Sequence, residues 1–481
     1  MTPARLSVAL TALLAALALT APAANAKPTP SGVRHLHLKF GPLAVQPGQN
    51  TIALAINKHR PKVNGWITSF KPNLVWKDGK QVPPVDVIHL HHAVWLVNYQ
   101  PTWAAGEEKT AVRLPKGFGW RYKTSDSWVL NHMIHNLTAE KSKVWITWDM
   151  DFIPDGSKAA KHIKQVTTRW MDVEGGKAYP VFDAPRGAGR NGRYTFPDQA
   201  QDPYADGNVR NHWVVDHDAT LVGTAGHLHP GGLWTDLKLT RNGRTVELFR
   251  SRAHYFEPAG AVSWDVSMYA TPPSWRVAVK KGDVLSVSGT YDTSRASWYE
   301  VMAIMPLAIT TAPDGGADPF KTSVAVKGIL THGHLHENDN HGGESTGLRD
   351  ASRVPDGPRT STIDIKDFVY QQGDLSLPGA AGRPPVLPQG QSLTFVNDDA
   401  SRNIFHTITD CKSPCNASTG IAYPLANGSS IFDSAELGFG PAGFTAAANV
   451  GSWQTPPNLP AGTYTYFCRI HPFMRGSFRV E

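Results

Sequence analysis

The chain has 481 residues, of which 18% are charged and 10% are aromatic, and its formal net charge is +7. That length allows about three domains of about 150 residues, each with its own core. The 43 glycines, 37 prolines and 15 tryptophans favour a turn-rich, all-β globular protein over a helical or disordered one. The basic excess is mild, and no block of Lys and Arg alternates with aromatic residues. Nucleic acid is therefore not an expected partner.

The first 26 residues have the pattern of an export signal. Arg5 gives a positive start, residues 6–19 are apolar, and Ala24-Asn25-Ala26 matches an A-x-A cleavage site. The apolar stretch is shorter than the roughly 20 residues that a membrane span needs, and no other segment comes closer. We expect cleavage after Ala26 and a protein secreted to an extracellular or periplasmic-type space, with no integral membrane segment.

Alternating apolar and polar runs, separated by turns rich in Pro and Gly, predict β-strands along most of the remaining chain. One stretch is instead rich in Asp, Gly, His and Pro and predicts a linker. We expect a signal peptide, an N-terminal β-domain, a second β-domain, a linker and a C-terminal β-domain over residues 1–26, 27–185, 186–312, 313–360 and 361–481.

Three cysteines are an odd number for an exported chain. Cys411 and Cys415 lie in the sequence CKSPC, close enough to form a disulfide across a tight turn in an oxidising compartment. Cys468 would then remain a free thiol.

Cys468 belongs to a set of residues that predicts a copper site. The tail YFCRIHPFMRG carries Cys468, His471 and Met474, and the upstream segment NIFHTITD carries His406 on an expected strand. Two imidazoles, one thiolate and a weak thioether are the ligands of a type 1 blue-copper site. The Cys-x2-His-x2-Met loop could fold three of these ligands around one ion, while His406 reaches across from a neighbouring strand.

This segment resembles the single-domain cupredoxins amicyanin, pseudoazurin and plastocyanin. The resemblance implies a Greek-key β-sandwich and an electron-transfer function, with His406, Cys468, His471 and Met474 as the copper ligands. Multicopper oxidases have a His directly after the blue-copper Cys, whereas this chain has Arg469. Laccase chemistry is therefore not expected.

The rest of the chain is rich in histidine, and 18 of the 20 histidines precede residue 342. Several stand in close clusters, in HLHHAVWL, NHMIHNLT and GHLHPGG. Their members are His89, His91 and His92, then His132 and His135, then His227 and His229.

Spacing shows which of these imidazoles can share an ion. Residues two apart lie on one face of a strand, so His227 and His229 can do so. The adjacent His91 and His92 would diverge in a regular strand. They need a strand end or a bulge to converge, or else His89 and His91 form the pair. No cysteine is available here, so nitrogen and thioether ligands favour copper over zinc.

The order of these motifs resembles the catalytic core of the ascorbate-dependent copper monooxygenases, the peptidylglycine α-hydroxylating and dopamine β-monooxygenase family. The resemblance covers about residues 35–310, through WITSFKPNL, HLHHAVWL, RLPKGFGWRYK, WVLNHMIHNL, GTAGHLHPGGLWTDL, KKGDVLSVSGTYD and YEVM. It implies two jelly-roll-like β-sandwich domains, each holding one copper.

The resemblance also implies two ligand sets. The electron-accepting copper would take His91, His92 and His135, with His132 as the alternative to His135. The oxygen-activating copper would take His227, His229 and Met302 as catalytic ligands, with Met305 as the alternative to Met302. Together with the blue-copper site, the chain would hold three coppers.

The sequence departs from this family around the substrate. No Cys precedes residue 411, so the disulfides of the animal enzymes are absent. Ala225 and Pro306 stand where the peptide hydroxylase has the Arg and Tyr that anchor a peptide carboxylate. The small-molecule or peptide substrate therefore stays open, as does the electron donor, ascorbate or a redox protein.

One further segment, THGHLHENDNHGG, carries His332, His334, His336 and His341. It is either a solvated polar loop or a segment that gathers copper or covers the active site. Taken together, the sequence predicts an exported copper monooxygenase with a fused blue-copper domain as its electron donor or relay. The alternative is a non-catalytic copper-binding electron-transfer protein.

Overall fold

The computed structural model describes residues 32–85, 87–177, 179–197, 208–256, 265–312, 314–334, 349–411, 430–438 and 450–481. Within these ranges the chain is almost entirely β, which confirms the predicted fold class. The helical segments there are short 3₁₀ turns, η1 (Ala159–His162), η4 (Ala351–Arg353) and η5 (Asp398–Arg402). No described helix is long and apolar enough to cross a membrane. The predicted signal of residues 1–26 lies outside the described residues.

We call residues 32–334 the body of the protein. Its first half is a sandwich of two sheets. The smaller sheet has the order β2-β8-β4-β5, formed by β2 (Asn50–Ile56), β8 (Trp128–Asn136), β4 (Ile88–Val97) and β5 (Gln100–Ala105). The long sheet begins with β1 (Arg34–Val45), β9 (Ser142–Pro154), β3 (Gly65–Trp76) and β7 (Phe118–Tyr122), and β6 (Val112–Arg113) pairs with β3.

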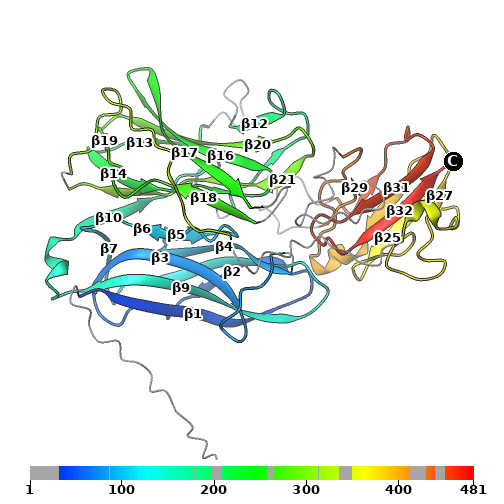
Figure 1. The fold of residues 1–481 in the computed structure, drawn as a ribbon, viewed down its shortest axis with the longest axis horizontal. Helices are drawn as coiled ribbons and strands as arrows, with labels where there is room; N and C mark the ends of the chain where they lie inside the picture. Colours follow the sequence, from blue (N-terminus) through cyan, green and yellow to red (C-terminus); the bar gives the residue numbers. More distant parts are fainter. Residues whose placement is uncertain are drawn as a thin grey trace, which may run out of the picture.

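The long sheet continues into the second half of the body. β7 pairs in parallel with β10, and the order then runs through β23, β14 and β19. These strands are β10 (Lys164–Arg169), β23 (Leu307–Thr310), β14 (Ala219–Thr224) and β19 (Val277–Val279). Hydrogen bonds of one sheet therefore join the two halves, which Figure 1 shows as blue strands below green ones.

A seven-stranded sheet covers the second half, in the order β12-β20-β16-β17-β18-β24, with β13 on β20. Its strands are β12 (Arg193–Phe196), β20 (Val284–Asp292), β16 (Gly232–Arg241), β17 (Arg244–Tyr255), β18 (Val266–Ala270), β24 (Ile329–Leu330) and β13 (His212–Val214). β24 comes from the segment predicted as a linker. This part of the segment forms a strand because its backbone pairs with the edge strand β18.

Two short pairs fix the chain near the histidine clusters. β11 (Phe182–Ala184) pairs with β21 (Trp298–Val301), and β15 (His227–Leu228) pairs with β22 (Ala303–Ile304). The alternation of side chains along each strand determines which of them face the core. In β4, for example, Leu90, Ala93 and Trp95 enter the first core, while histidines occupy other positions of the strand. Burying a large apolar side chain of this kind contributes about 1.5–3 kcal/mol.

The C-terminal domain, as we call residues 349–481, is a sandwich of two four-stranded sheets. The first has the order β26-β25-β28-β30, from β26 (Val369–Tyr370), β25 (Thr362–Lys366), β28 (Thr394–Asn397) and β30 (Ser452–Gln454). The second has the order β27-β32-β31-β29, from β27 (Val386–Leu387), β32 (Arg475–Val480), β31 (Gly462–Phe467) and β29 (Thr409–Cys411).

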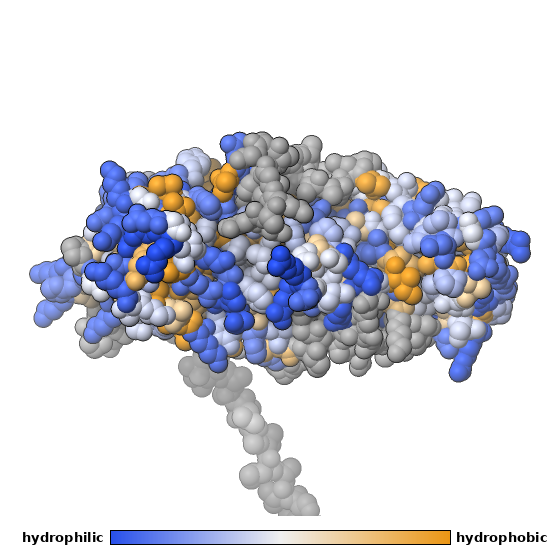
Figure 2. Space-filling model, turned by 90° about the horizontal axis from the view of Figure 1, so that it is seen from above, coloured by the Kyte–Doolittle hydropathy of each residue, from blue (hydrophilic) through white to orange (hydrophobic). Residues whose placement is uncertain are grey.

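The C-terminal domain packs directly on the body (Figure 1). Phe467 and Cys411 belong to the same buried cluster as the core of the second half. Ile470 packs on Val85 and Leu137 of the first half. By contrast, the face drawn in Figure 2 is mainly hydrophilic, with small separate hydrophobic groups.

Candidate metal centres

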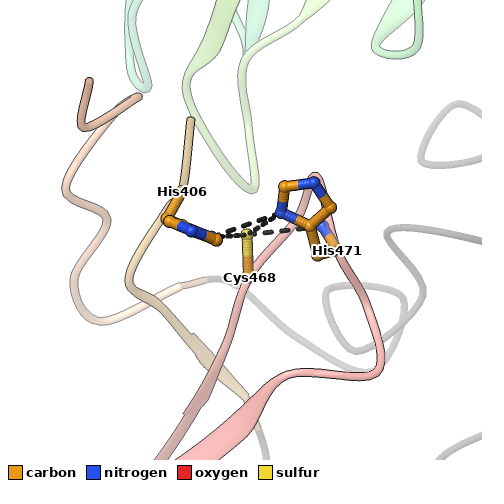
Figure 3. Close-up of side chains that lie close together, drawn as sticks. All are labelled: His406, Cys468 and His471. Atoms are coloured by element: carbon orange, nitrogen blue, oxygen red, sulfur yellow. Dashed lines mark hydrogen bonds between the residues drawn. The ribbon is translucent and has the colours of Figure 1, made fainter. Parts of the chain in front are cut away.

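Three of the four predicted blue-copper ligands, His406, Cys468 and His471, converge at one end of the C-terminal domain. Cys468 directly follows β31, and its thiol lies 3.8 Å from Nδ1 of His406 and 3.7 Å from Nδ1 of His471. The two Nδ1 atoms are 3.2 Å apart (Figure 3). In the described part of the chain, no other group of three His, Cys, Asp or Glu residues brings its ligand atoms within 4.8 Å of one another.

Backbone bonds hold the loop that carries three of these ligands. The N–H of Cys468 donates to the carbonyl of Met474 at 3.1 Å, and the N–H of Met474 donates to the carbonyl of His471 at 2.9 Å. The side chain of Met474 is buried in the core of the domain. His406 comes from another segment, and it forms a two-bond bridge with Leu437 instead of lying inside the predicted strand. The strand itself, β29, begins three residues later.

The thiol is surrounded by groups that favour its anion. The backbone N–H groups of Thr407 and His471 each donate to Sγ of Cys468 at 3.3 Å. Burial by itself would raise the pKa of the Cys468 thiol, but the bonds from His406 and His471 outweigh it and hold the pKa well below its ordinary value. A thiolate with two imidazoles is the donor set that copper prefers, so these residues fit a type 1 copper ion.

Asp399, which the sequence analysis did not identify, orients His406. Its Oδ2 lies 3.0 Å from Nε2 of His406, so Nδ1 is the ring nitrogen left to face Cys468. The carboxylate also accepts the backbone N–H groups of Asp367 and Phe368 at 2.8 and 3.0 Å. Burial favours a higher pKa for Asp399, but these bonds prevail and keep the pKa well below its ordinary value. The carboxylate is therefore ionised.

In the body, a β-bulge brings adjacent histidines to one face. The pairing of β4 with β8 shifts between Leu90 and His92, so His91 is the extra residue. This is the irregularity that the adjacent pair requires, and it places Nδ1 of His91 3.4 Å from Nδ1 of His92. His89 keeps the regular register and stands opposite His135 on β8.

The two candidate histidines of β8 lie on different sides of the sheet. The ring of His135 packs on His91, with 4.3 Å between their centroids. The ring of His132 instead packs on Phe40 at 5.6 Å, against the core of the first sandwich. The structure thus places His135, and not His132, beside His91.

His227 of β15 and His229, which directly follows this strand, line different cavities. His229 lies against His91, with ring centroids 4.6 Å apart, although the two residues belong to different halves of the body. Both line a cavity of about 110 Å³ together with His89 and His135. His227 instead faces a second, larger cavity of about 1030 Å³, which His92 and Met302 also line.

Glu108 and Asn131 hold the two histidines of the larger cavity. Nδ1 of His227 lies 3.0 Å from Oε2 of Glu108, and Nε2 of His92 lies 3.1 Å from Oδ1 of Asn131. Met302 is buried beside this cavity, whereas Met305 lies in the core of the second half. By cavity lining, His92 falls with His227, and His91 falls with His135 and His229. Contacts within the two predicted ligand sets are also present, since the Nδ1 atoms of His91 and His92 are 3.4 Å apart and the rings of His227 and His229 are 5.3 Å apart. The copper ligands of the body remain predictions.

Burial keeps the clustered imidazoles neutral. It lowers the pKa of His91, His135 and His229 well below the ordinary value, and neighbouring imidazoles lower it further. Burial likewise lowers the pKa of His89 and His92 to about 4. Neutral imidazoles carry the lone pair that a metal ion needs, so no proton has to leave before binding.

The segment THGHLHENDNHGG begins beside the larger cavity. Nε2 of His332 contacts the backbone carbonyl of Glu108, and Nδ1 of His334 lies 2.8 Å from Oδ2 of Asp265. His336 and His341 lie outside the described residues. Cys415 also lies outside them, so its disulfide with Cys411 stays a prediction. Cys468 is a free, buried cysteine.

No protein-family model matches the sequence, and no curated protein matches it. Among solved structures, the Cu(I) form of a methionine-to-alanine mutant of amicyanin is similar at 20% identity, covering 28% of this chain and 94% of amicyanin, with a TM-score of 0.16. A purple cupredoxin from Nitrosopumilus maritimus is similar at 22% identity, covering 25% of this chain and all of that protein, also with a TM-score of 0.16. The assignment of the C-terminal site depends on its geometry, not on these likenesses.

Proposed function

We propose that the protein is an exported redox protein whose C-terminal type 1 copper site, held by His406, Cys468, His471 and Met474, transfers single electrons to the histidine-rich body. We further propose that the body is a copper monooxygenase that uses these electrons with O2 to hydroxylate a substrate. Copper, when bound, supplies the one-electron couple.

The observation that carries the proposal is the position of Cys468. Its thiol is fully buried, receives two backbone N–H groups and faces two imidazole Nδ1 atoms. The two residues that follow it, Arg469 and Ile470, line the same cavity as His91, His135 and His229. The chain therefore leads directly from the predicted copper thiolate to the imidazoles of the body.

The larger cavity supports a reaction on a substrate. It lies between the two halves of the body, and its size of about 1030 Å³ is that of a pocket for a sizeable organic molecule. His92, His227 and Met302 on its wall are nitrogen and thioether donors that suit copper. Its other walls include Trp170 and Trp213, which suit an aromatic substrate, together with Arg113, Arg169 and Arg210, which suit a negatively charged group on it.

A second candidate function is non-catalytic copper binding with electron transfer. It is favoured by one observation: no three histidines in the described part of the body bring their nitrogens within 4.8 Å of one another. The larger cavity favours the monooxygenase, because a protein that only stores electrons has no need of a substrate pocket.

Absorption spectroscopy and O2 consumption test the proposal. The copper-loaded, oxidised protein should show an intense blue thiolate-to-copper band, and Cys468→Ser should abolish that band without unfolding the chain. Reduced protein should consume O2 in the presence of a substrate from an aromatic panel, and Met302→Ala should lower that rate while the band survives. A colourless oxidised protein would refute the electron-transfer proposal. Retention of the blue band without any hydroxylated product would favour the second candidate.

A further inference from the structure

The smaller cavity is a junction of all three parts of the chain. His91 and His135 come from the first half of the body, His229 from the second half, and Thr407, Arg469 and Ile470 from the C-terminal domain. We propose that His91, His135 and His229 together hold one copper ion at this junction. The inference rests on the proposed electron transfer, but it assigns a ligand set that neither predicted site contains.

Ring contacts and burial support this set. His91 lies between the other two, 4.3 Å from the ring of His135 and 4.6 Å from the ring of His229. All three side chains are buried at 8% exposure or less. The cavity of about 110 Å³ has room for an ion and a water molecule. Since the three nitrogens are not yet within 4.8 Å of one another, ion binding would turn the rings toward a common point.

The backbone positions of His91 and His229 are fixed, while their rings remain able to turn toward an ion. The bulge in β4 turns His91 to the face that His135 occupies. The backbone of His229 is held because its N–H donates to the hydroxyl of Tyr291 at 3.1 Å. That hydroxyl in turn donates to the carbonyl of Met302 at 2.6 Å. A bulge and a buried tyrosine are thus both arranged so that imidazoles from two halves meet.

The chemistry of the set favours copper. Three neutral imidazoles suit copper or zinc, and copper binds nitrogen donors more tightly than the other divalent ions of its row. Glu300 and Glu436 line the same cavity and add two carboxyl groups to its wall. The two residues that follow Cys468 in the chain, Arg469 and Ile470, also line this cavity. A redox-active ion at this point could exchange electrons with the C-terminal site over a short distance past Arg469 and Ile470, which zinc could not.

Copper counting in single and double variants tests the ligand set. Cu(II) alone is the probe, added to the full chain by equilibrium dialysis in a Cys468→Ser background, so that only the copper of the body is counted by elemental analysis. We expect His91→Ala and His229→Ala each to lose one ion per chain, and the double variant to lose that same single ion. Loss of two ions in the double variant, or loss of none in either single variant, would overturn the shared site.

A matched pair on β8 controls for the fold. His135→Ala should lose the ion, whereas His132→Ala, three residues away on the other side of the sheet, should retain it. Loss in His132→Ala and retention in His135→Ala would refute the set. In chains that keep Cys468, an unchanged blue band shows that the variants are folded. If the unmodified chain shows no blue band but these ions behave as expected, the electron-transfer proposal fails and the junction site stands.

Discussion

The imidazole of His406 is clamped by Asp399, whose Oδ2 lies 3.0 Å from its Nε2. Burial by itself would lower the pKa of His406, but the bonds to Asp399 and Cys468 raise it. The carboxylate therefore both orients the ring and strengthens Nδ1 as a donor. Partners of this kind, one bond removed from the metal, are as much part of a site as the ligands.

Asp399→Asn should weaken copper retention at the C-terminal site by about 10- to 100-fold, because the amide cannot hold the ring with a charge-assisted bond. The reduction potential of the site should rise, since His406 becomes a weaker donor to the oxidised ion. Competition with a chelator measures the first effect and redox titration of the blue band the second. Asp398→Asn, at the exposed neighbouring position, should change neither. Equal losses in both variants would mean that the carboxylate of Asp399 is not a positioning group.

Arg469 fastens the C-terminal domain to the body. Its Nη1 donates to the carbonyl of Ser297 and to Oδ2 of Asp433, both at 2.8 Å, and its guanidinium stacks 4.7 Å from the ring of Trp298. Arg469→Ala should slow electron transfer from the blue site to the body and lower stability by about 1–3 kcal/mol, because a half-buried carbonyl and a carboxylate lose their donor. Flash reduction followed at the blue band measures the rate. Arg383→Ala, at an exposed arginine of the same domain, should leave the rate unchanged.

The sequence was sufficient for those features that depend on local spacing. Alternation predicted strands such as β2 and β9, and the Cys-x2-His-x2-Met spacing predicted the loop around Cys468. The adjacent His91 and His92 predicted a strand end or a bulge, or else a pair of His89 and His91, and the structure has the bulge. Each of these features is decided within a few residues of chain.

Features that depend on distant contacts could not be predicted in this way. Asp399 carries no local signal, since an aspartate in a turn before a strand is common on any surface. The approach of His229 to His91 is set by how the two halves pack along the long sheet, which no spacing within either motif records. The same packing places His227 and His229 on the walls of different cavities, although their rings lie only 5.3 Å apart.

Glu107 should make the stability of the body depend on pH. Burial raises its pKa from an ordinary value near 4.5 to about 7, although Lys109, whose Nζ lies 3.3 Å from Oε1, acts in the opposite direction. As the pH rises from 4.5 to 7, the unfolded chain loses this proton and the folded chain keeps it. The stabilising contribution is therefore complete below pH 4.5 and is lost as the pH rises through 7.

Each pH unit of that window corresponds to about 1.4 kcal/mol, so the loss is at most about 3.5 kcal/mol. Urea unfolding at acidic and at mildly alkaline pH should show this fall in the unmodified protein. Glu107→Gln, which stays neutral throughout, should reduce the difference. Glu140→Gln, at an exposed position, should preserve it. An identical pH profile in the Glu107 variant would show that another group is responsible.

Gly106 lets His227 and Glu108 meet. A Cβ atom at this position would lie 2.5 Å from Cε1 of His227 and 2.6 Å from Oε2 of Glu108, so the two side chains could not keep their 3.0 Å contact. Gly106→Ala should therefore separate them and destabilise the protein by about 1–3 kcal/mol, as overpacking of a buried site does.

Urea unfolding measures that loss, and the nitrogen chemical shifts of the His227 ring report whether its bond to Glu108 survives. Gly333→Ala is the matched control, because a Cβ atom there meets no heavy atom within 4 Å. It should unfold at the urea concentration of the unmodified protein. If Gly106→Ala kept both the stability and the ring shifts of His227, the close approach of Glu108 would not depend on the glycine. The wall of the larger cavity would then have more room than the contacts of His227 indicate.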